Sequence, residues 1–229
     1  MKNVVLLGAT QGIGRELAVA YAQRGDHVII TGREADRAAK VADEIEGDVD
    51  GIALDLARPH EIAESLATVG NVDRLVILGM VRDTNTLADF DVARASVLAL
   101  TKVVGYTAAV SALRTRLSEH AAVLLFGGIT KDAPYPGSTT LSTANSALVG
   151  MVRTLSIELA PVRVNSIHPG GIEDSPFGRQ VPAAALDRAR GQTLAHRLGT
   201  MNDVVDGCLF LLENPMANGI DLSLDGGRV

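Results

Sequence analysis

Three glycines near the N-terminus have the spacing of a phosphate-binding turn. They are Gly8, Gly12 and Gly14, and they lie between an apolar run and an amphipathic segment, in the stretch LGATQGIG. Gly8 would permit a tight turn, Gly12 would let a pyrophosphate approach the backbone, and Gly14 would let a helix pack closely on a strand. The unpaired N–H groups and the positive end of that helix would face the phosphates. The spacing therefore predicts a nucleotide-binding turn.

At the end of the second apolar run the sequence offers a cation in place of a carboxylate. An Asp or Glu at this point would hold a free ribose 2′-hydroxyl, but the residues are Thr31, Gly32 and Arg33. The Arg33 guanidinium can bind a 2′-phosphate through two parallel hydrogen bonds, and Arg15 or Gln11 would lie nearby to help. We therefore expect NADP(H) in preference to NAD(H). The plainer alternative is a solvated surface arginine.

Asp55 ends the third apolar run and has two interpretations. Its carboxylate could accept a hydrogen bond from the amino group of an adenine. It could also cap the amphipathic segment that begins at Pro59. The residues alone leave both interpretations open.

Other catalytic motifs are missing from the sequence. No lysine follows a glycine as it does in a P-loop, and there is no Gly-x-Ser-x-Gly elbow. There is no pair of cysteines and no i, i+4 pair of histidines, so the sequence predicts no metal site. The scattered histidines are His27, His60, His120, His168 and His196.

The composition argues against nucleic acid and membranes as partners. The chain has 229 residues, a formal net charge of −6 and 3% aromatic residues. Nucleic acids and anionic lipids need a clustered positive field, and single strands also need aromatic stacking platforms. The longest uncharged segment, 133–152, contains two prolines and six Ser or Thr residues, so we expect no transmembrane helix. The single cysteine, Cys208, and the absence of a signal-like N-terminus predict a cytoplasmic protein.

Short apolar runs alternate along the chain with longer segments whose apolar residues repeat every three or four positions. The first kind predicts buried parallel strands and the second predicts helices. The alternation indicates a single domain over residues 1–229, an α/β doubly wound Rossmann fold with a seven-stranded parallel sheet in the order 3-2-1-4-5-6-7. The expected strands are Val4–Leu7, His27–Thr31, Gly51–Leu54, Arg74–Leu78, Ala122–Phe126, Val162–Ile167 and Ile220–Leu224; the expected helices are Gly12–Arg24, Glu34–Glu46, Pro59–Val69, Ala88–Leu117, Ser138–Ala160 and Met201–Glu213.

The segment 172–198 interrupts this alternation. It contains Pro176, Pro182 and a short helical stretch over Ala183–Arg190. Long connections at the carboxyl ends of strands are usually lids or substrate loops, so we expect a substrate loop here. A solvated helical flap is the alternative.

Four stretches together resemble the short-chain dehydrogenase/reductase family, and the likeness extends over essentially the whole chain. They are the Gly8–Gly14 turn, Ile167–Ile172 (IHPGGI), Arg197–Gly199 (RLG) and Leu224–Gly227 (LDGG). The resemblance implies adenine contacts from the third strand end, an adenosine-ribose contact near Gly79, a backbone contact from Ile172 to the nicotinamide amide, and a homodimer or homotetramer. The expected cofactor-binding residues, from the motifs and the resemblance together, are Gly8, Thr10, Gln11, Gly12, Ile13, Gly14, Arg33, Asp55, Leu56, Gly79, Asn145, Pro169, Gly170 and Ile172.

The same resemblance shows what the chain lacks. The family's reaction uses a Ser, a Tyr thirteen residues later and a Lys four residues after that. In this frame the sequence has Gly128, Leu141 and Asn145, so all three catalytic side chains are absent and we assign no catalytic residue. Two further departures agree, because Ile77 and Leu78 stand where the family has Asn-Asn or Asn-Ala, and Ser96 stands near its usual Asn.

This loss bears directly on the reaction. Reduction of a carbonyl needs a proton as the hydride arrives, and removing a positioned acid lowers the rate by about 10²–10⁴. Asn145 could still hydrogen-bond the nicotinamide ribose, and Gly128 with Leu141 would leave a roomier, drier pocket that suits an apolar ligand. Other polar side chains lie near the expected cleft in sequence, but none has a spacing that places it at the reacting carbon: Tyr135, Lys131, Ser142, Thr139, Thr140, His168 and Asp174.

Two functions of different class follow from these observations. The first is an oxidoreductase that uses NADP(H) on a small carbonyl, alcohol or enone with a non-standard proton donor. The second is a catalytically silent protein that senses NADP(H) or acts through a partner. Binding of NADPH without turnover of any ketone, quinone or enone would favour the second.

Overall fold

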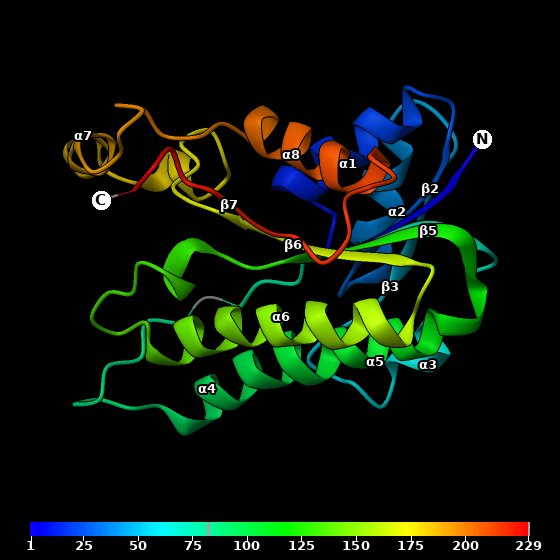
Figure 1. Ribbon diagram of the computed structural model, residues 1–229, viewed down its shortest axis with the longest axis horizontal. Helices are drawn as coiled ribbons and strands as arrows, with labels where there is room; N and C mark the ends of the chain where they lie inside the picture. The colour runs from blue at the N-terminus through cyan, green and yellow to red at the C-terminus, as the bar shows by residue number, and fades with distance from the viewer. Residues whose placement is uncertain (82, 229) are drawn as a thin grey trace.

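A seven-stranded parallel sheet forms the centre of the computed structural model, which describes residues 1–81 and 83–228 (Figure 1). Its strand order is β3-β2-β1-β4-β5-β6-β7, which confirms the predicted doubly wound fold and strand order. The strands are β1 (Asn3–Leu7), β2 (His27–Gly32), β3 (Val49–Ala53), β4 (Val72–Ile77), β5 (Leu117–Phe126), β6 (Arg163–Pro169) and β7 (Asp221–Leu224).

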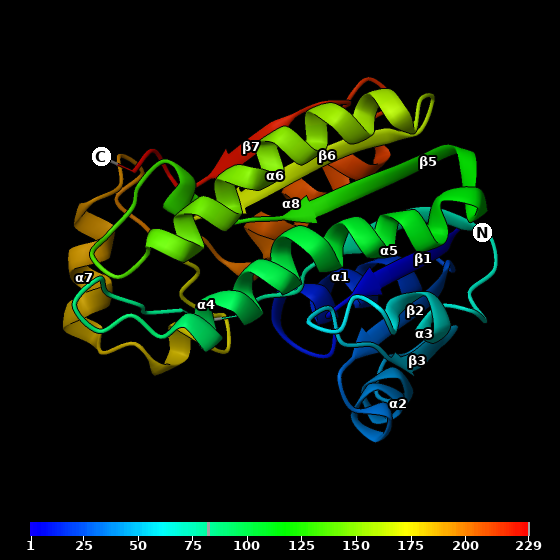
Figure 2. The same ribbon diagram turned by 90° about the horizontal axis from the view of Figure 1, so that it is seen from below.

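Helices cover both faces of this sheet (Figures 1 and 2). On one face α1, α2 and α8 enclose one apolar cluster, and on the other α3, α5 and α6 enclose a second one. The helices are α1 (Gly12–Ala22), α2 (Ala35–Asp43), α3 (Ile62–Ser65), α4 (Val92–Ala99), α5 (Tyr106–Leu113), α6 (Thr139–Glu158), α7 (Ala183–Gly191) and α8 (Met201–Glu213), with a π-helical segment η1 (Leu100–Gly105) and 3-10 turns η2 (Arg114–Arg116), η3 (Ile129–Lys131) and η4 (Gly178–Gln180).

The central strands are apolar on both sides because helices cover both faces. Val4, Val5, Leu6 and Leu7 of β1 are all fully buried, alternately in the first cluster and in the second. Such continuous apolar runs are typical of parallel sheets. All parallel strands end at the same edge of the sheet, so the loops after them meet there, and α7 lies beyond that edge (Figure 2).

The long helix expected over 88–117 is shorter and less regular than predicted. It begins at Val92, because the Asn85 side chain holds both backbone groups of Asp91, and the Asp91 carboxylate then caps the helix at the N–H of Arg94 (3.0 Å). It continues through η1 and α5 to η2, and β5 already starts at Leu117. The expected last helical residue is therefore the first strand residue, paired with Val72 of β4.

The helix expected over 59–69 was also predicted too long. Only Ile62–Ser65 form α3, and its N-cap is Glu61, which makes no side-chain capping bond. The chain before it runs through turns in which Arg58 N–H binds the carbonyl of Asp55 and Glu61 N–H binds that of Arg58. The third strand is Val49–Ala53 rather than 51–54, since its pairing with β2 begins at Val49.

The passage from Val92 to Arg116 is long and apolar enough to cross a membrane by length and composition alone. In the structure 44% of its most apolar window is buried. The passage runs alongside α6 on one face of the sheet (Figures 1 and 2), and α5 supplies core residues to the second apolar cluster. Packing of this passage against the sheet and α6 therefore accounts for many of its apolar residues.

Candidate functional site

The glycine turn after β1 has the backbone that its sequence predicts. Gly8 has φ +88° and Gly12 has φ +58°, both in the left-handed region that favours glycine. A Cβ on Gly14 would lie 2.7 Å from the Cα of Ala9, so only glycine permits this closeness of helix and turn. The N-cap residue Gln11 makes no side-chain capping bond, and the first turn of α1 has no acidic residue. The first N–H groups of α1 are therefore available to an anion.

The turn is fixed to the end of β2. Gly8 N–H donates to Thr31 Oγ1 (3.1 Å), and Ala9 N–H donates to the Thr31 carbonyl (3.0 Å). A Cβ on Gly32 would meet the methyl group of Thr10 at 2.6 Å. The absence of a side chain at Gly32 thus lets the end of β2 pack against the turn, which places Arg33 next to it.

A cationic patch borders this turn. Arg33 is exposed and has no hydrogen bond or ion pair with any residue in the described ranges. Arg37, on the first turn of α2, donates to Gln11 Oε1 (3.0 Å). Arg15 lies instead near Glu44, with 3.8 Å between Nη2 and Oε2. Of the two expected helpers of Arg33, Gln11 therefore lies on this patch and Arg15 is directed elsewhere. Arg37 was not among the predicted residues, although its place four residues after Arg33 could have indicated it.

The loop after β3 lies against the loop after β4. A Cβ on Gly79 would meet Leu56 Cδ1 at 2.3 Å, so these two predicted residues are in contact. The Asp55 carboxylate accepts a hydrogen bond from Ala57 N–H (3.0 Å), within its own loop. The interpretation of Asp55 as a helix cap is therefore wrong, since α3 starts only at Ile62.

Gly128, Leu141 and Asn145 lie at the carboxyl end of β5 and the start of α6. Asn145 is 2% exposed, and its Nδ2 donates to Thr130 Oγ1 (2.8 Å). Its Oδ1 is buried and has no hydrogen-bond partner among residues 1–81 and 83–228. A Cβ on Gly128 would lie 3.0 Å from Asn145 Nδ2, whereas the backbone of Gly128 is extended and would accept any residue. The half-buried Leu141 supplies no polar atom.

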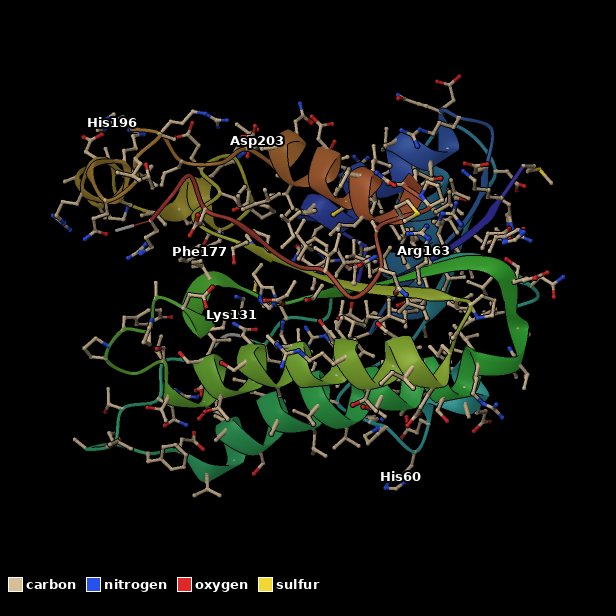
Figure 3. The ribbon with its side chains drawn as sticks, in the orientation of Figure 1. His60, Lys131, Arg163, Phe177, His196 and Asp203 are labelled. Carbon is tan, nitrogen blue, oxygen red and sulfur yellow. The ribbon has the colours of Figure 1, made fainter. Side chains whose placement is uncertain are left out.

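Most of the alternative polar side chains are engaged with other protein groups. Lys131 pairs with Asp221 (3.0 Å) and with Asp132 (Figure 3), Ser142 shares a hydrogen bond with Ser138, and Asp174 accepts from Met201 N–H. Thr139 and Tyr135 are exposed, the latter by 46%, and Thr140 is partly exposed.

His168 is engaged as well and is fully buried. Its Nε2 lies 2.7 Å from Asp221 Oδ1, and its Nδ1 faces the backbone N–H of Gly128 (3.2 Å). Burial lowers the pKa of His168, and the carboxylate of Asp221 opposes that shift without cancelling it. A Cβ on Gly127 would lie 2.2 Å from this ring, so the backbone just after β5 covers the imidazole.

A buried lysine and tyrosine lie under the same edge of the sheet, and the sequence analysis missed both. Lys102 of η1 is 2% exposed, and its Nζ donates to the carbonyl of Phe126 (2.6 Å). Tyr106 Oη lies 2.9 Å from the carbonyl of Gly79 and 3.1 Å from that of Phe126. Burial lowers the pKa of Lys102 to about 7 and raises the pKa of Tyr106 above its usual range. Their i, i+4 spacing in an apolar helix was a signal that could have revealed them.

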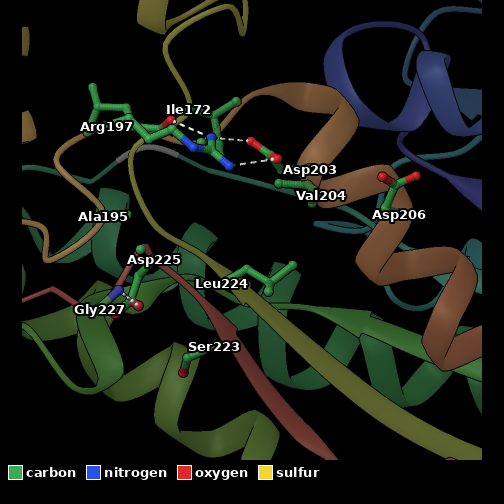
Figure 4. Close-up of a pocket in the computed structure, with 13 residues that line it drawn as sticks. Ile172, Ala195, Arg197, Asp203, Val204, Asp206, Ser223, Leu224, Asp225 and Gly227 are labelled. Carbon is green, nitrogen blue, oxygen red and sulfur yellow. Dashed lines mark hydrogen bonds and ion pairs between the residues drawn. The ribbon is translucent and has the colours of Figure 1, made fainter.

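The RLG stretch (Arg197–Gly199) and the LDGG stretch (Leu224–Gly227) line one pocket together (Figure 4). Leu194 and Ala195, just before the RLG stretch, donate backbone hydrogen bonds to Gly227 and Gly226. Arg197 pairs with Asp203 at 2.6 Å, and hydrogen bonds from Arg197 and Thr200 lower the pKa of that carboxyl. The only predicted cofactor residue that lines the pocket is Ile172, so the motifs mainly join the segment 172–198 to the C-terminus.

Ile172 itself is held in an extended position. The backbone around it pairs with Gly199, through Gly199 N–H to the carbonyl of Gly171 and Glu173 N–H to the carbonyl of Gly199. Gly170 N–H donates to the carbonyl of Leu224 (2.8 Å), which fixes the Pro169-Gly170 turn after β6. Within the described part of the chain, the N–H of Ile172 has no acceptor.

The fold and this edge define a dinucleotide-binding protein of the doubly wound class. The chain matches the family model described as enoyl-(acyl carrier protein) reductase over residues 8–228. Carbonyl reductase family member 4 of Danio rerio is 29% identical, covering 97% of this chain and 96% of that protein. L-rhamnose 1-dehydrogenase (NADP(+)) of Thermoplasma acidophilum is 27% identical, covering 100% and 96%. A solved structure of a putative betaketoacyl-ACP reductase has a TM-score of 0.88 at 27% identity, covering 99% and 97%.

The chain belongs to the short-chain dehydrogenase/reductase family, whose members are oxidoreductases that bind a nicotinamide cofactor. The expected family and fold are thereby confirmed. The individual cofactor contacts, and the consequence of Gly128, Leu141 and Asn145 for the reaction, stay predictions.

Proposed function

We propose that this protein is an NADP(H)-dependent oxidoreductase for a small carbonyl, alcohol or enone, with a proton donor other than the family's tyrosine. The observation that carries the proposal is the unpaired Arg33 beside a glycine turn whose helix N–H groups are also unpaired. A dinucleotide with a 2′-phosphate would satisfy both groups. One relative of this chain is named as an NADP(+) enzyme, and another as a carbonyl reductase.

The residues present fit a bound dinucleotide along the whole edge. Gly8 and Gly12 have the left-handed backbone of a phosphate-binding turn, and Leu56 with Gly79 would flank the adenosine. The unpaired Oδ1 of Asn145 would accept a hydrogen bond from a hydroxyl of the nicotinamide ribose. When bound, the cofactor supplies or takes the hydride, and these residues hold it in place.

The test of this proposal compares NADPH and NADH. Arg33→Ala should weaken NADPH binding about 10- to 100-fold in a fluorescence titration and leave NADH binding nearly unchanged, because hydrogen bonds to a charged group contribute about 1.5–3 kcal/mol. Arg114→Ala removes an exposed arginine from η2 at the opposite edge of the sheet and is the matched control. An equal loss of both cofactors, or of neither, would exclude Arg33 as the 2′-phosphate ligand.

The second candidate, a silent NADP(H)-binding protein, is favoured by a specific observation. Lys131, Ser142, His168 and Asp174 are engaged with other groups, so none is free to deliver a proton in this conformation. NADPH binding without oxidation by any of a panel of ketones, quinones and enones would support this candidate. Consumption of NADPH with one of them would support the oxidoreductase.

A triple variant sharpens that choice. Gly128→Ser, Leu141→Tyr and Asn145→Lys together restore the family frame, and the extended backbone of Gly128 accepts a serine once the Asn145 side chain has been replaced. Gain of turnover would show that the rest of the cleft is intact. Continued inactivity with NADPH still bound would mean that the substrate pocket has diverged too.

We further propose that the protein acts as a homodimer or homotetramer in the cytoplasm. The helix pair α4 and α6 lies on one face of the molecule (Figure 1), and apolar side chains of that region remain exposed. Val104→Arg should therefore shift the mass measured by light scattering toward that of the monomer. The exposed apolar side chains are Val92, Val97, Leu100, Val103, Val104 and Ile157.

A further inference from the structure

Lys102 is an unusual residue for the interior of this domain. It is 2% exposed, and within the described residues it forms no ion pair. Its ammonium donates to a single acceptor, the carbonyl of Phe126, and lies 5.5 Å from the centre of the Tyr106 ring, so two of its three protons have no hydrogen-bond acceptor in that part of the chain. Burying a charge in this way is costly, and a fold keeps such a group mainly where it has a use.

The position of Lys102 relates it to the predicted cofactor edge. Phe126 is the last residue of β5, and ligands of doubly wound sheets bind beyond the carboxyl ends of the strands. Tyr106 joins the same carbonyl to that of Gly79, which follows the neighbouring strand β4. The ammonium therefore lies at the carboxyl ends of β4 and β5. Its acceptor, the Phe126 carbonyl, is two residues before Gly128.

Within the described residues Asn145 lacks a hydrogen-bond donor to its Oδ1, and its side chain binds the chain on the other side of Gly128, at Thr130. Its Nδ2 is bound to Thr130, and its Oδ1 is buried without a donor. The Lys102 ammonium binds Phe126 and the Asn145 amide binds Thr130, so both side chains contact the stretch 126–130. The elements that carry them, η1 and α6, pack against each other. Lys102 requires an acceptor and Asn145 Oδ1 requires a donor. A hydroxyl group is both, and can satisfy the two side chains at once.

We propose that Lys102 supplies, from the helix α4–η1–α5, the cofactor-facing ammonium that the family frame places at position 145, and that Lys102 and Asn145 together bind one hydroxyl of the nicotinamide ribose. The ammonium would thus come from the helix next to the one that carries it in the family frame. The inference rests on the proposed binding of NADP(H). It assigns no proton transfer to Lys102, which acts as a ligand of the ribose.

The test is NADPH affinity as a function of pH, measured by fluorescence titration between pH 6.5 and 9. Since the pKa of Lys102 in the free protein is about 7, the ammonium needed for binding is present below pH 7 and is lost above it. The ratio of wild-type affinity to that of Lys102→Met should be at least about tenfold at pH 6.5 and should fall as the pH rises. This ratio cancels the ionisation of the cofactor phosphate.

Two further variants separate binding from structure. Tyr106→Phe removes another hydrogen bond to the Phe126 carbonyl but keeps Lys102, and should preserve the wild-type pH profile. Lys102→Asn combined with Asn145→Lys should regain affinity that each single exchange loses. Lys102→Met should also raise the melting temperature of the free protein or leave it unchanged, because it removes a buried ammonium.

Each outcome has a distinct meaning. Equal affinity and the same pH profile in wild type and Lys102→Met would overturn the inference while leaving the proposed function intact. Loss of affinity in Tyr106→Phe as large as in Lys102→Met would also overturn it, because the Phe126 carbonyl alone would then explain the effect. Failure of the wild-type protein to bind NADPH at any pH would instead refute the proposed function.

Discussion

The two edges of the sheet differ in how completely some of their buried and charged side chains are hydrogen-bonded within the protein. At the amino-terminal edge, Arg74 binds Glu213 through two hydrogen bonds of 2.9 and 3.0 Å. Lys2 and Tyr21 also donate to Glu213, at 2.6 and 2.8 Å. At the carboxyl edge, Lys102 keeps unused protons, Asn145 keeps an unused oxygen and Arg33 has no partner in the described ranges. Figure 3 shows how far apart the edges are, with Arg163 near one and Lys131 near the other.

The difference separates stability from binding. In the amino-terminal cluster the charged groups are paired with one another. The cluster therefore stabilises the free protein and leaves few unpaired groups for a ligand. At the carboxyl edge Arg33, Lys102 and Asn145 keep unused donors or acceptors, which costs stability in the free protein and becomes favourable only when a ligand supplies the missing partners. Substitutions at the two edges should therefore affect different measurements.

The largest effect should come from Glu213→Gln. It leaves the Arg74 guanidinium, a side chain only 10% exposed, without its carboxylate partner, and removing one partner of such a buried pair costs about 3 kcal/mol. Urea unfolding monitored by circular dichroism measures the loss. Glu44→Gln, which disrupts an exposed pair at 3.8 Å, should cost less than about 0.5 kcal/mol. NADPH affinity of the folded Glu213→Gln variant should equal that of wild type; a changed affinity would contradict the separation.

Lowering the pH should remove the stabilisation by Glu213 more gradually than the substitution does. Burial by itself raises the pKa of Glu213, but hydrogen bonds from Arg74, Lys2 and Tyr21 outweigh it and lower the pKa from 4.5 to about 2. The contribution is therefore complete above pH 4.5 and is lost as the pH falls toward 2. Between pH 6 and pH 3 the wild type should lose about 2 kcal/mol more than Glu213→Gln does. Parallel pH profiles of the two proteins would show that Glu213 is not the titrating group.

The fold was predictable because its main signals are local and repeated. Apolar runs such as Val4–Leu7 and glycines at required turns are visible in one dimension, and the strand order followed from alternation and handedness. The ends of helices were not predictable where tertiary hydrogen bonds set them. The start of α4 at Val92 depends on Asn85 reaching Asp91, and the shortness of α3 depends on turns that Asp55 initiates.

The site was predictable only as far as motifs extend. The glycine turn and the cation at Arg33 belong to contiguous stretches, so the sequence revealed both. The i, i+4 spacings of Lys102 with Tyr106 and of Arg37 with Arg33 are only hints, because the hydrogen-bond partners that relate Lys102 and Arg37 to this edge lie 24 and 26 positions away in the chain. A lysine in an apolar helix looks like a surface residue until the structure shows it buried against β5.

At the carboxyl edge, Asn145→Leu tests the reverse of the Glu213 result. The change removes an unpaired buried oxygen together with the bond to Thr130, so the free energy of unfolding should change by less than about 1 kcal/mol. NADPH affinity should fall about three- to tenfold, since one hydrogen bond to the ribose is lost. Calorimetric titration with NADPH and urea unfolding of the same sample measure both. A large loss of stability without a loss of affinity would place Asn145 in the scaffold instead.

Within the Glu213 cluster, the smaller effect should come from Lys2→Met. Lys2 lies closer to Glu213 (2.6 Å) than Arg74 does (2.9 Å), but its side chain is 39% exposed. Solvent already screens that ammonium, so its removal should cost less than about 1 kcal/mol, well below the cost of Glu213→Gln. Urea midpoints of the two variants make the comparison directly. A Lys2→Met effect equal to that of Glu213→Gln would mean that distance, rather than burial, determines what this cluster contributes, and the contrast between the edges would then need another cause.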